Sequence, residues 1–400
     1  MRALVLDGDT RAALAIVRSL GRRGIGVTVA SVEDVSLAGC SRWCSARAVY
    51  PCPRSSPAAF GGWLVSALSS MPDAVLYTAS DVTTSIVSRY RESLPSSVQE
   101  NLPPRLSLDI ALDKSATIDL ARALGVPGPK SRIIERGATI KLSGWDYPVA
   151  VKSAQSDAPY RPATTFARDA NELGLALADV LRESPRALVQ EMIPGEGTAI
   201  FALFDRGKPV ATFAHRRVIE KPPWGGVSVL CESIEPRPET LSRALRLLEE
   251  LHWHGVAMVE FKASALGEPC LMEINPRFWG SLELAVRAGV DFPYLAFQLA
   301  RGETPHVDAP RRAVNRWVIG EIDSLTTSLL RGGEGRSRIR DLGTHIWNLR
   351  HGLCCEVERL SDPRPALYEY KAWFHVTAGR LAYHRRGGRA GCEKQIVPGE

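Results

Sequence analysis

Three oxygen-bearing side chains, Glu260, Glu273 and Asn275, have the types and spacing that suit a divalent cation. Successive side chains of a strand point to opposite faces, so Glu273 and Asn275 are expected to share one face, together with Leu271. Glu260 stands in an earlier apolar run that is typical of a second strand. Mg²⁺ prefers carboxylate and amide oxygens and fills its other positions with water and phosphate oxygens. The pattern predicts a magnesium site, although an E-x-N-P string would also suit a strand that ends at a turn.

Two lysines are candidates for contacts with phosphate groups. Lys152 ends the apolar run 147–151, where a rigid strand would hold its long cationic side chain at one edge of a sheet. A lysine in such a place commonly just extends its amino group into water. Lys114 follows Asp113 directly before a helical pattern, and it would suit either an anion or an exposed surface. Neither lysine identifies a site by itself.

The order of these residues along the chain resembles that of the ATP-grasp superfamily. In that superfamily a D-K pair comes first, a V-K strand and a Q-E-x-[IVL] hinge follow, and the metal ligands close the series. Residues 273–281, which read E-I-N-P-R-F-W-G-S, extend the resemblance, and it covers roughly residues 106–305. The matching residues here are Asp113-Lys114, Val151-Lys152, Gln190-Glu191-Met192-Ile193, Glu260, Glu273 and Asn275.

The resemblance implies that the chain binds ATP with Mg²⁺, or with Mn²⁺ in its place. The two lysines would contact the α- and β-phosphates, and the backbone of the hinge would form hydrogen bonds with the adenine. An acid after the hinge would bind the ribose hydroxyls. The nucleotide-binding residues implied in this way are Lys114, Lys152, Gln190, Glu191, Ile193 and Glu196.

Arg277 and Lys152 are the catalytic residues that the resemblance implies. Arg277 directly follows the metal strand, and its planar guanidinium would suit the γ-phosphate or an acyl phosphate, unless it forms only a surface salt bridge. Two strings between the hinge and the metal site, 215–217 (H-R-R) and 224–226 (W-G-G), are candidates for contact with the acceptor substrate. Residues 153–160 contain no glycine, which departs from the glycine-rich loop of many family members. Phosphate affinity would then depend more on the two lysines.

The N-terminal part has the pattern of a βαβ unit that must lie beside this site. Residues 3–6 and 24–30 are strand-like, the segment between them has helical spacing, and residues 74–78 provide another strand. The first loop lacks G-x-G-x-x-G, which disfavours a dinucleotide site and an NAD-dependent oxidoreductase. Prolines at 103 and 104 mark a boundary after this part.

The expected fold class is α/β, with α+β character in the ATP-grasp part. A small parallel α/β domain at 1–105 would precede a two-lobed ATP-grasp domain at 106–310. A basic extension at 311–400 would follow, and its sequence does not indicate an architecture. It holds 16 Lys and Arg against 10 Asp and Glu, which accounts for the whole net charge of +6.

Composition is that of a globular protein with substantial cores, because 45% of the residues are hydrophobic and 24% are charged. No apolar run reaches the roughly 18 residues that a membrane span needs. We therefore expect a cytoplasmic protein with reduced cysteines and without a transmembrane segment or a nucleic-acid partner. A homodimer is compatible with the resemblance.

The leading functional hypothesis is an ATP-dependent ligase of the carboxylate–amine type, similar to D-alanine–D-alanine ligase and D-aspartate ligase. It would join a small carboxylate to an amine through an acyl phosphate and release ADP and phosphate. Two alternatives remain open at this point. One is a carboxylase that activates bicarbonate, which the absence of N-T-R after Glu273 disfavours, and the other is an ATP-binding module without turnover.

Overall fold

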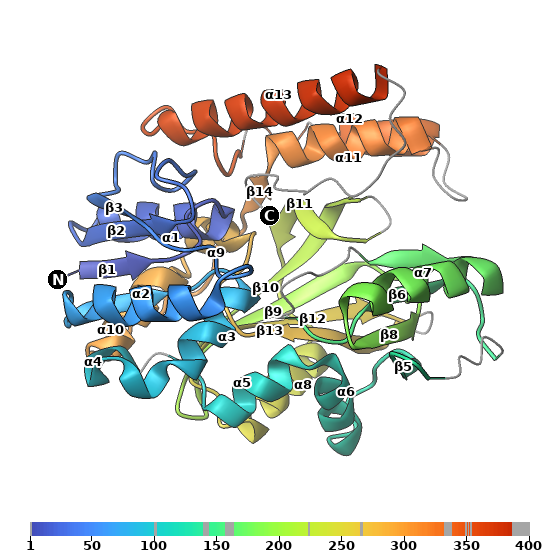
Figure 1. Cartoon of the computed structure of the whole chain (residues 1–400), viewed down its shortest axis with the longest axis horizontal. Helices are drawn as coiled ribbons and strands as arrows, with labels where there is room; N and C mark the ends of the chain where they lie inside the picture. The colour runs from blue at the N-terminus through green and yellow to red at the C-terminus, as the bar shows by residue number, and fades with distance from the viewer. Residues whose placement is uncertain are drawn as a thin grey trace.

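The computed structural model describes residues 2–385 except 100–101, 139–143, 157–163, 223–224, 265–266, 332–337, 349, 351 and 353. Figure 1 shows the N-terminal α/β part on one side of the molecule and the two sheets formed by later strands beside it. Helices α11, α12 and α13 lie along one edge. The mixed α/β fold class is confirmed. Within the described residues, no helix is both long and apolar enough to cross a membrane.

The N-terminal sheet is parallel throughout, in the order β3-β2-β1-β4. Its strands run with their carboxyl ends at one edge, so the loops that follow β1 and β4 lie next to each other. A helix follows each of these loops, and the side chains of Thr10 and Ser80 cap the two helices. The elements are β1 (Arg2–Val5), α1 (Arg11–Gly21), β2 (Gly26–Ser31), β3 (Ala46–Val49), α2 (Pro57–Ser69), β4 (Ala74–Tyr77), α3 (Asp81–Arg89), a 3₁₀ turn (Arg91–Ser93) and α4 (Ser96–Gln99).

A four-stranded antiparallel sheet forms the small lobe, in the order β5-β8-β6-β7. Val149, Val151 and Val189 pack on helix α7. Because side chains alternate along a strand, Lys152 and Gln190 point to the opposite face of the sheet. The elements are β5 (Ser131–Glu135), β6 (Val149–Ser153), β7 (Thr165–Ala167), α7 (Ala170–Glu183) and β8 (Arg186–Glu191).

The large sheet is antiparallel and has the order β13-β12-β9-β10-β11-β14. One face packs around Trp253 with helices α5, α6 and α8, and the other packs around Phe201 and Trp279 with α1, α9 and α10. The elements are α5 (Arg105–Leu112), α6 (Lys114–Ala123), β9 (Gly197–Asp205), β10 (Lys208–Lys221), β11 (Val227–Ser233), α8 (Pro238–Glu250), β12 (Gly255–Ala263), β13 (Pro269–Asn275), α9 (Leu282–Ala288), α10 (Phe292–Ala300) and β14 (Val314–Arg316).

A bulge in β13 overturns one expectation about side-chain direction. Glu260 pairs with Glu273, but the next residue, Phe261, pairs with Leu271, so β13 carries one extra residue there. Leu271 consequently packs in the same core cluster as Ile274, on the face covered by α8. The prediction that Leu271 shares a face with Glu273 and Asn275 is wrong, because strict alternation stops at the bulge.

Residues beyond 310 are built into the rest of the fold. Strand β14 pairs with β11 at the edge of the large sheet, and Figure 1 shows the three following helices on one side of the molecule. The segment 354–362 returns to the N-terminal domain, where Glu356 and Asp362 form buried ion pairs with Arg11 and Arg18 of α1. The remaining elements are α11 (Val318–Arg331), α12 (Arg338–Asn348) and α13 (Arg364–Arg385).

Candidate nucleotide and metal site

The three predicted metal ligands lie together on strands β12 and β13. The pairing of these strands places Glu260 directly opposite Glu273. The Asn275 amide nitrogen donates to Glu260 Oε1 at 3.1 Å and to Glu273 Oε1 at 3.3 Å. Neither acid is exposed to solvent on more than a small part of its surface. Glu260, Glu273 and Asn275 therefore form one cluster, as their spacing in the sequence predicted. Their role as metal ligands stays a prediction.

Burial and neighbouring charges act on this cluster in opposite directions. Burial raises the pKa of Glu260, the guanidinium of Arg217 lowers it, and the nearby Glu273 carboxylate raises it again. Arg217 forms ion pairs with Glu260 and, at 3.3 Å, with Glu220. No group of three or more His, Cys, Asp or Glu side chains with metal-binding geometry occurs in the described part of the chain. Two carboxylates and one amide nevertheless fit Mg²⁺, which takes water and phosphate oxygens at its other positions.

Arg217 reaches Glu260 across strand β9, and Gly197 makes this path available. A Cβ atom at Gly197 would lie 3.2 Å from both the Arg217 Cδ and the Glu220 Oε1. That distance is shorter than ordinary contact, so a side chain at position 197 would displace the arginine. The sequence indicated Arg217 only as a substrate contact. Its ion pair with Glu260 was missed, because no sequence pattern shows that these two residues lie close together.

Lys114 lies beside the metal cluster, as its predicted role requires. Its Nζ is 3.9 Å from Glu273 Oε2 and 2.6 Å from the hydroxyl of Ser156. The side chain is only 3% exposed. Asp113 holds it there, since its carboxylate caps α6 and forms an ion pair with Arg186 of the small lobe. Ser156 belongs to the glycine-free segment 153–160, of which residues 157–160 lie outside the described part of the chain.

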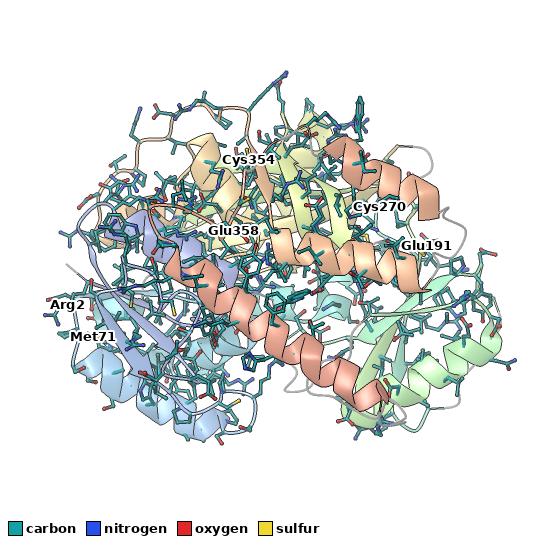
Figure 2. The ribbon with its side chains drawn as sticks, turned by 90° about the horizontal axis from the view of Figure 1, so that it is seen from above. Arg2, Met71, Glu191, Cys270, Cys354 and Glu358 are labelled. Carbon is teal, nitrogen blue, oxygen red and sulfur yellow. The ribbon has the colours of Figure 1, made fainter. Side chains whose placement is uncertain are left out.

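The residues predicted to bind adenine lie at the end of β8, beside the start of the large sheet. Gln190 donates to the Ser131 hydroxyl at 3.0 Å, and the Glu191 carboxylate accepts from the backbone N–H of Lys130 at 2.9 Å. Ile193 is buried. Figure 2 shows Glu191 near Cys270, the second residue of β13. Burial raises the pKa of the Cys270 thiol, and the negative charges of Glu268 and then Glu191 add to this effect. The hinge therefore adjoins the strand that carries the metal ligands.

Glu196 lies apart from the buried cluster. Its side chain is 68% exposed and is 3.4 Å from Arg216. The structure thus leaves it accessible, and its contact with ribose stays a prediction.

Replacing Lys152 with alanine is expected to raise the KM for ATP more than it lowers kcat. Lys152 is buried on the face of the small sheet opposite α7, where an ammonium group would attract phosphate oxygens. Steady-state kinetics over a range of MgATP concentrations would measure both constants. Lys208→Ala, a change at an exposed lysine of β10, is the matched control. An unchanged KM in a folded Lys152→Ala protein would contradict the assignment.

Arg277 contacts both the metal cluster and the N-terminal domain. Its Nη2 donates to Asn275 Oδ1 at 3.2 Å, and its Nε donates to Asp81 Oδ1 at 2.8 Å. This ion pair excludes the alternative that Arg277 lies in a surface salt bridge, because Asp81 is only 7% exposed. The sequence reasoning missed Asp81. The available signal was its position just after a strand of a parallel sheet, where polar groups commonly serve a site.

The candidate substrate contacts at 215–217 separate into different environments. His215 is buried against Phe201 with ring centroids 4.7 Å apart, and burial lowers the pKa of the imidazole well below its usual value. Arg216 instead forms ion pairs with Glu232 and Glu196 near the surface. In the second string, Trp224 lies outside the described residues.

Known proteins share both the sequence pattern and the fold. Residues 183–321 match the family described as "ATP-grasp in the biosynthetic pathway with Ter operon". A D-alanine–D-alanine ligase from Syntrophotalea carbinolica is 28% identical over 185 residues, which make up 42% of this chain and 57% of the ligase. The match thus spans little more than half the length of that relative.

Solved structures with the same fold include an L-amino acid ligase from Bacillus licheniformis. It has a TM-score of 0.60 at 18% identity, covering 75% of this chain and 73% of the ligase. An N5-carboxyaminoimidazole ribonucleotide synthetase from Thermus thermophilus has a TM-score of 0.58 at 17% identity, covering 78% of this chain and 82% of the synthetase. The fold agrees with these structures, and residues 183–321 carry the sequence match to the ATP-grasp family.

Proposed function

We propose that the protein is an ADP-forming ligase that joins a small carboxylate, such as an amino acid or peptide, to an amine. The observation that carries this proposal is the cluster in which the Asn275 amide bridges Glu260 and Glu273 while Lys114 lies 3.9 Å from Glu273. Similarity to a D-alanine–D-alanine ligase supports this reaction class. The shared fold does not distinguish among ATP-grasp chemistries by itself.

The residues divide the work of phosphoryl transfer between them. Lys114 and Lys152 would neutralise the phosphates of ATP, and Arg277 would direct N–H groups at the phosphoryl group in transfer. Glu260, Glu273 and Asn275 would hold Mg²⁺, which supplies further neutralisation of the phosphate charge. The γ-phosphoryl group passes to the substrate carboxylate, ADP leaves, and the amine then displaces phosphate from the acyl phosphate.

A carboxylase that activates bicarbonate is the second candidate. It is favoured by the fold shared with N5-carboxyaminoimidazole ribonucleotide synthetase, although identity to that enzyme is only 17%. Both reactions would use the same phosphate and metal residues. The acceptor of the phosphoryl group therefore has to be identified by experiment.

Hydroxylamine is expected to replace the natural amine and to yield a hydroxamate from the correct carboxylic acid. The reason is that a strong nucleophile captures an acyl phosphate once it forms. Pools of amino acids and dipeptides would be incubated with MgATP and hydroxylamine, and hydroxamate and ADP would be measured together. Reactions without Mg²⁺ or without ATP are the controls.

Each outcome of this screen selects one candidate. Hydroxamate that depends on ATP, Mg²⁺ and a particular acid supports the ligase. ADP release that depends on bicarbonate, with no hydroxamate from any acid, supports the carboxylase. Binding of MgATP with no ADP release under any condition supports a module without turnover.

A further inference from the structure

A buried ion pair joins the N-terminal domain to the end of the metal strand. Arg277 Nε donates to Asp81 Oδ1 at 2.8 Å, and the two side chains are 19% and 7% exposed. Nearby, the backbone N–H of Phe278 donates to the carbonyl of Thr78 at 3.4 Å. The position of Arg277 is therefore set by a residue 196 positions away in another layer of the fold.

Asp81 is itself firmly held, because the start of α3 is tied to the end of β1. The carboxylate of Asp7 accepts hydrogen bonds from the Ala79 N–H at 2.8 Å, the Thr83 hydroxyl at 2.7 Å and the Ser80 hydroxyl at 3.0 Å. Asp7 has a φ of 58°, a left-handed value that aspartate tolerates better than most residues. These bonds hold the chain on both sides of Asp81, the first residue of α3.

Arg277 donates three hydrogen bonds to described residues, which leaves part of its guanidinium without a partner among them. An arginine has five N–H donors. Nε donates to Asp81, Nη1 to the Phe278 carbonyl at 3.0 Å, and Nη2 to Asn275 Oδ1 at 3.2 Å. Within the described residues, one N–H therefore remains on each terminal nitrogen, and Nη2 is the nitrogen bonded to Asn275 of the metal cluster. Asp81 engages Nε instead.

We propose that Asp81 is a positioning residue, which holds Arg277 so that its two remaining N–H groups meet the phosphoryl group in transfer. This inference rests on the proposed function, because it takes the metal cluster as the place where the γ-phosphate binds. Asp81 itself does not touch the nucleotide. Its effect passes through Arg277, so Asp81 links the N-terminal domain to the chemistry of the ATP-grasp domain.

The experiment compares ADP with a non-hydrolysable triphosphate analogue, AMPPNP. Calorimetry with Mg²⁺ would measure both affinities for wild type, Asp81→Asn and Asp81→Glu, with kcat determined in parallel. Removing the charge should lower the affinity for AMPPNP by roughly 10–100-fold, as expected for a partner that orients a binding group. The affinity for ADP should not change. The Glu variant should recover most of the loss, since it restores a carboxylate.

Asp179→Asn is the matched control, because Asp179 forms an exposed ion pair with Arg182 on α7. Thermal unfolding of every variant would show whether it is folded. Equal loss of ADP and AMPPNP binding, accompanied by lower stability in both Asp81 variants, would reduce Asp81 to a structural role and overturn the proposal. An unchanged preference for AMPPNP in Asp81→Asn would also overturn it.

Failure of the proposed function gives a different result. If wild type releases no ADP with any acid and amine but still prefers AMPPNP to ADP, the ligase is disproved while the comparison of Asp81 variants remains decisive. If wild type binds neither nucleotide, both proposals are wrong, because no phosphoryl group reaches Arg277.

Discussion

Replacing Glu273 with glutamine is expected to lower kcat by about 10²–10³-fold, which is the usual effect of removing one group that stabilises charge in a transition state. Glutamine preserves the shape of the side chain, and its carbonyl oxygen still accepts from the Asn275 amide, now 3.3 Å away. Only the negative charge is lost. That charge faces Lys114 and lies opposite Glu260, so its removal weakens cation binding where phosphate charge must be neutralised.

The matched control is Glu268→Gln, a change at a half-exposed acid just before the same strand. ADP release with the correct acid and amine would be measured for both variants, together with Mg²⁺ titrations in the presence of ATP. The control should retain wild-type kcat. Wild-type activity in a folded Glu273→Gln protein would remove the basis for the metal assignment.

Replacing Asp362 with alanine is expected to destabilise the protein by about 3–5 kcal/mol, because it leaves a buried arginine without its counter-ion. Arg18 Nε lies 2.9 Å from Asp362 Oδ2, and the two side chains are 1% and 0% exposed. The same carboxylate also accepts from the Ser41 hydroxyl and the Arg42 N–H. The alanine variant would lose these bonds too, so the loss of stability should be large.

Acid should remove part of this stability in the wild-type protein. Burial alone would raise the pKa of Asp362, but its hydrogen bonds from Arg42, Ser41 and Arg18 outweigh burial and hold the pKa below its usual value. A carboxylate whose pKa is lower in the folded state contributes stability above the unfolded pKa, near pH 4. That contribution disappears as the pH falls through the lower folded value.

Thermal unfolding of Asp362→Ala and of Asp179→Ala would provide the measurement. Asp179 belongs to an exposed ion pair with Arg182, and such pairs contribute only about 0–1 kcal/mol. The Tm of Asp362→Ala should fall less on acidification than the Tm of the wild type, because the variant has already lost this carboxylate. The Tm of Asp179→Ala should respond to acid as the wild type does. Equal shifts for both variants would mean that residues 354–362 do not stabilise the N-terminal domain.

The sequence predicted those parts of the fold and site that depend on local pattern. Short apolar runs and a helical segment between them predicted the parallel N-terminal sheet, and the structure confirms its first strands near the expected bounds. The ordered motifs also brought Glu260, Glu273, Asn275 and Lys114 into one cluster. Order along the chain was informative here because neighbouring antiparallel strands place nearby segments side by side.

Contacts between distant segments could not be predicted in this way. The bulge that turns Leu271 away from Glu273 depends on how β13 pairs with β12, and alternation alone assumes that no residue is inserted. The Asp81–Arg277 pair depends on how two domains pack. The architecture after residue 310 was also inaccessible, because a three-residue strand such as β14 is recognisable only from the sheet that it extends.

The ion pair between Arg18 and Asp362 also constrains the order of events during protein synthesis. Its two residues are separated by 344 positions. At a translation rate of about 5–20 residues per second, the carboxylate emerges roughly 17–69 s after the arginine. During that interval α1 carries a guanidinium whose final place is the protein interior. The N-terminal domain is made first, yet it completes its packing only after almost all of the described chain has left the ribosome.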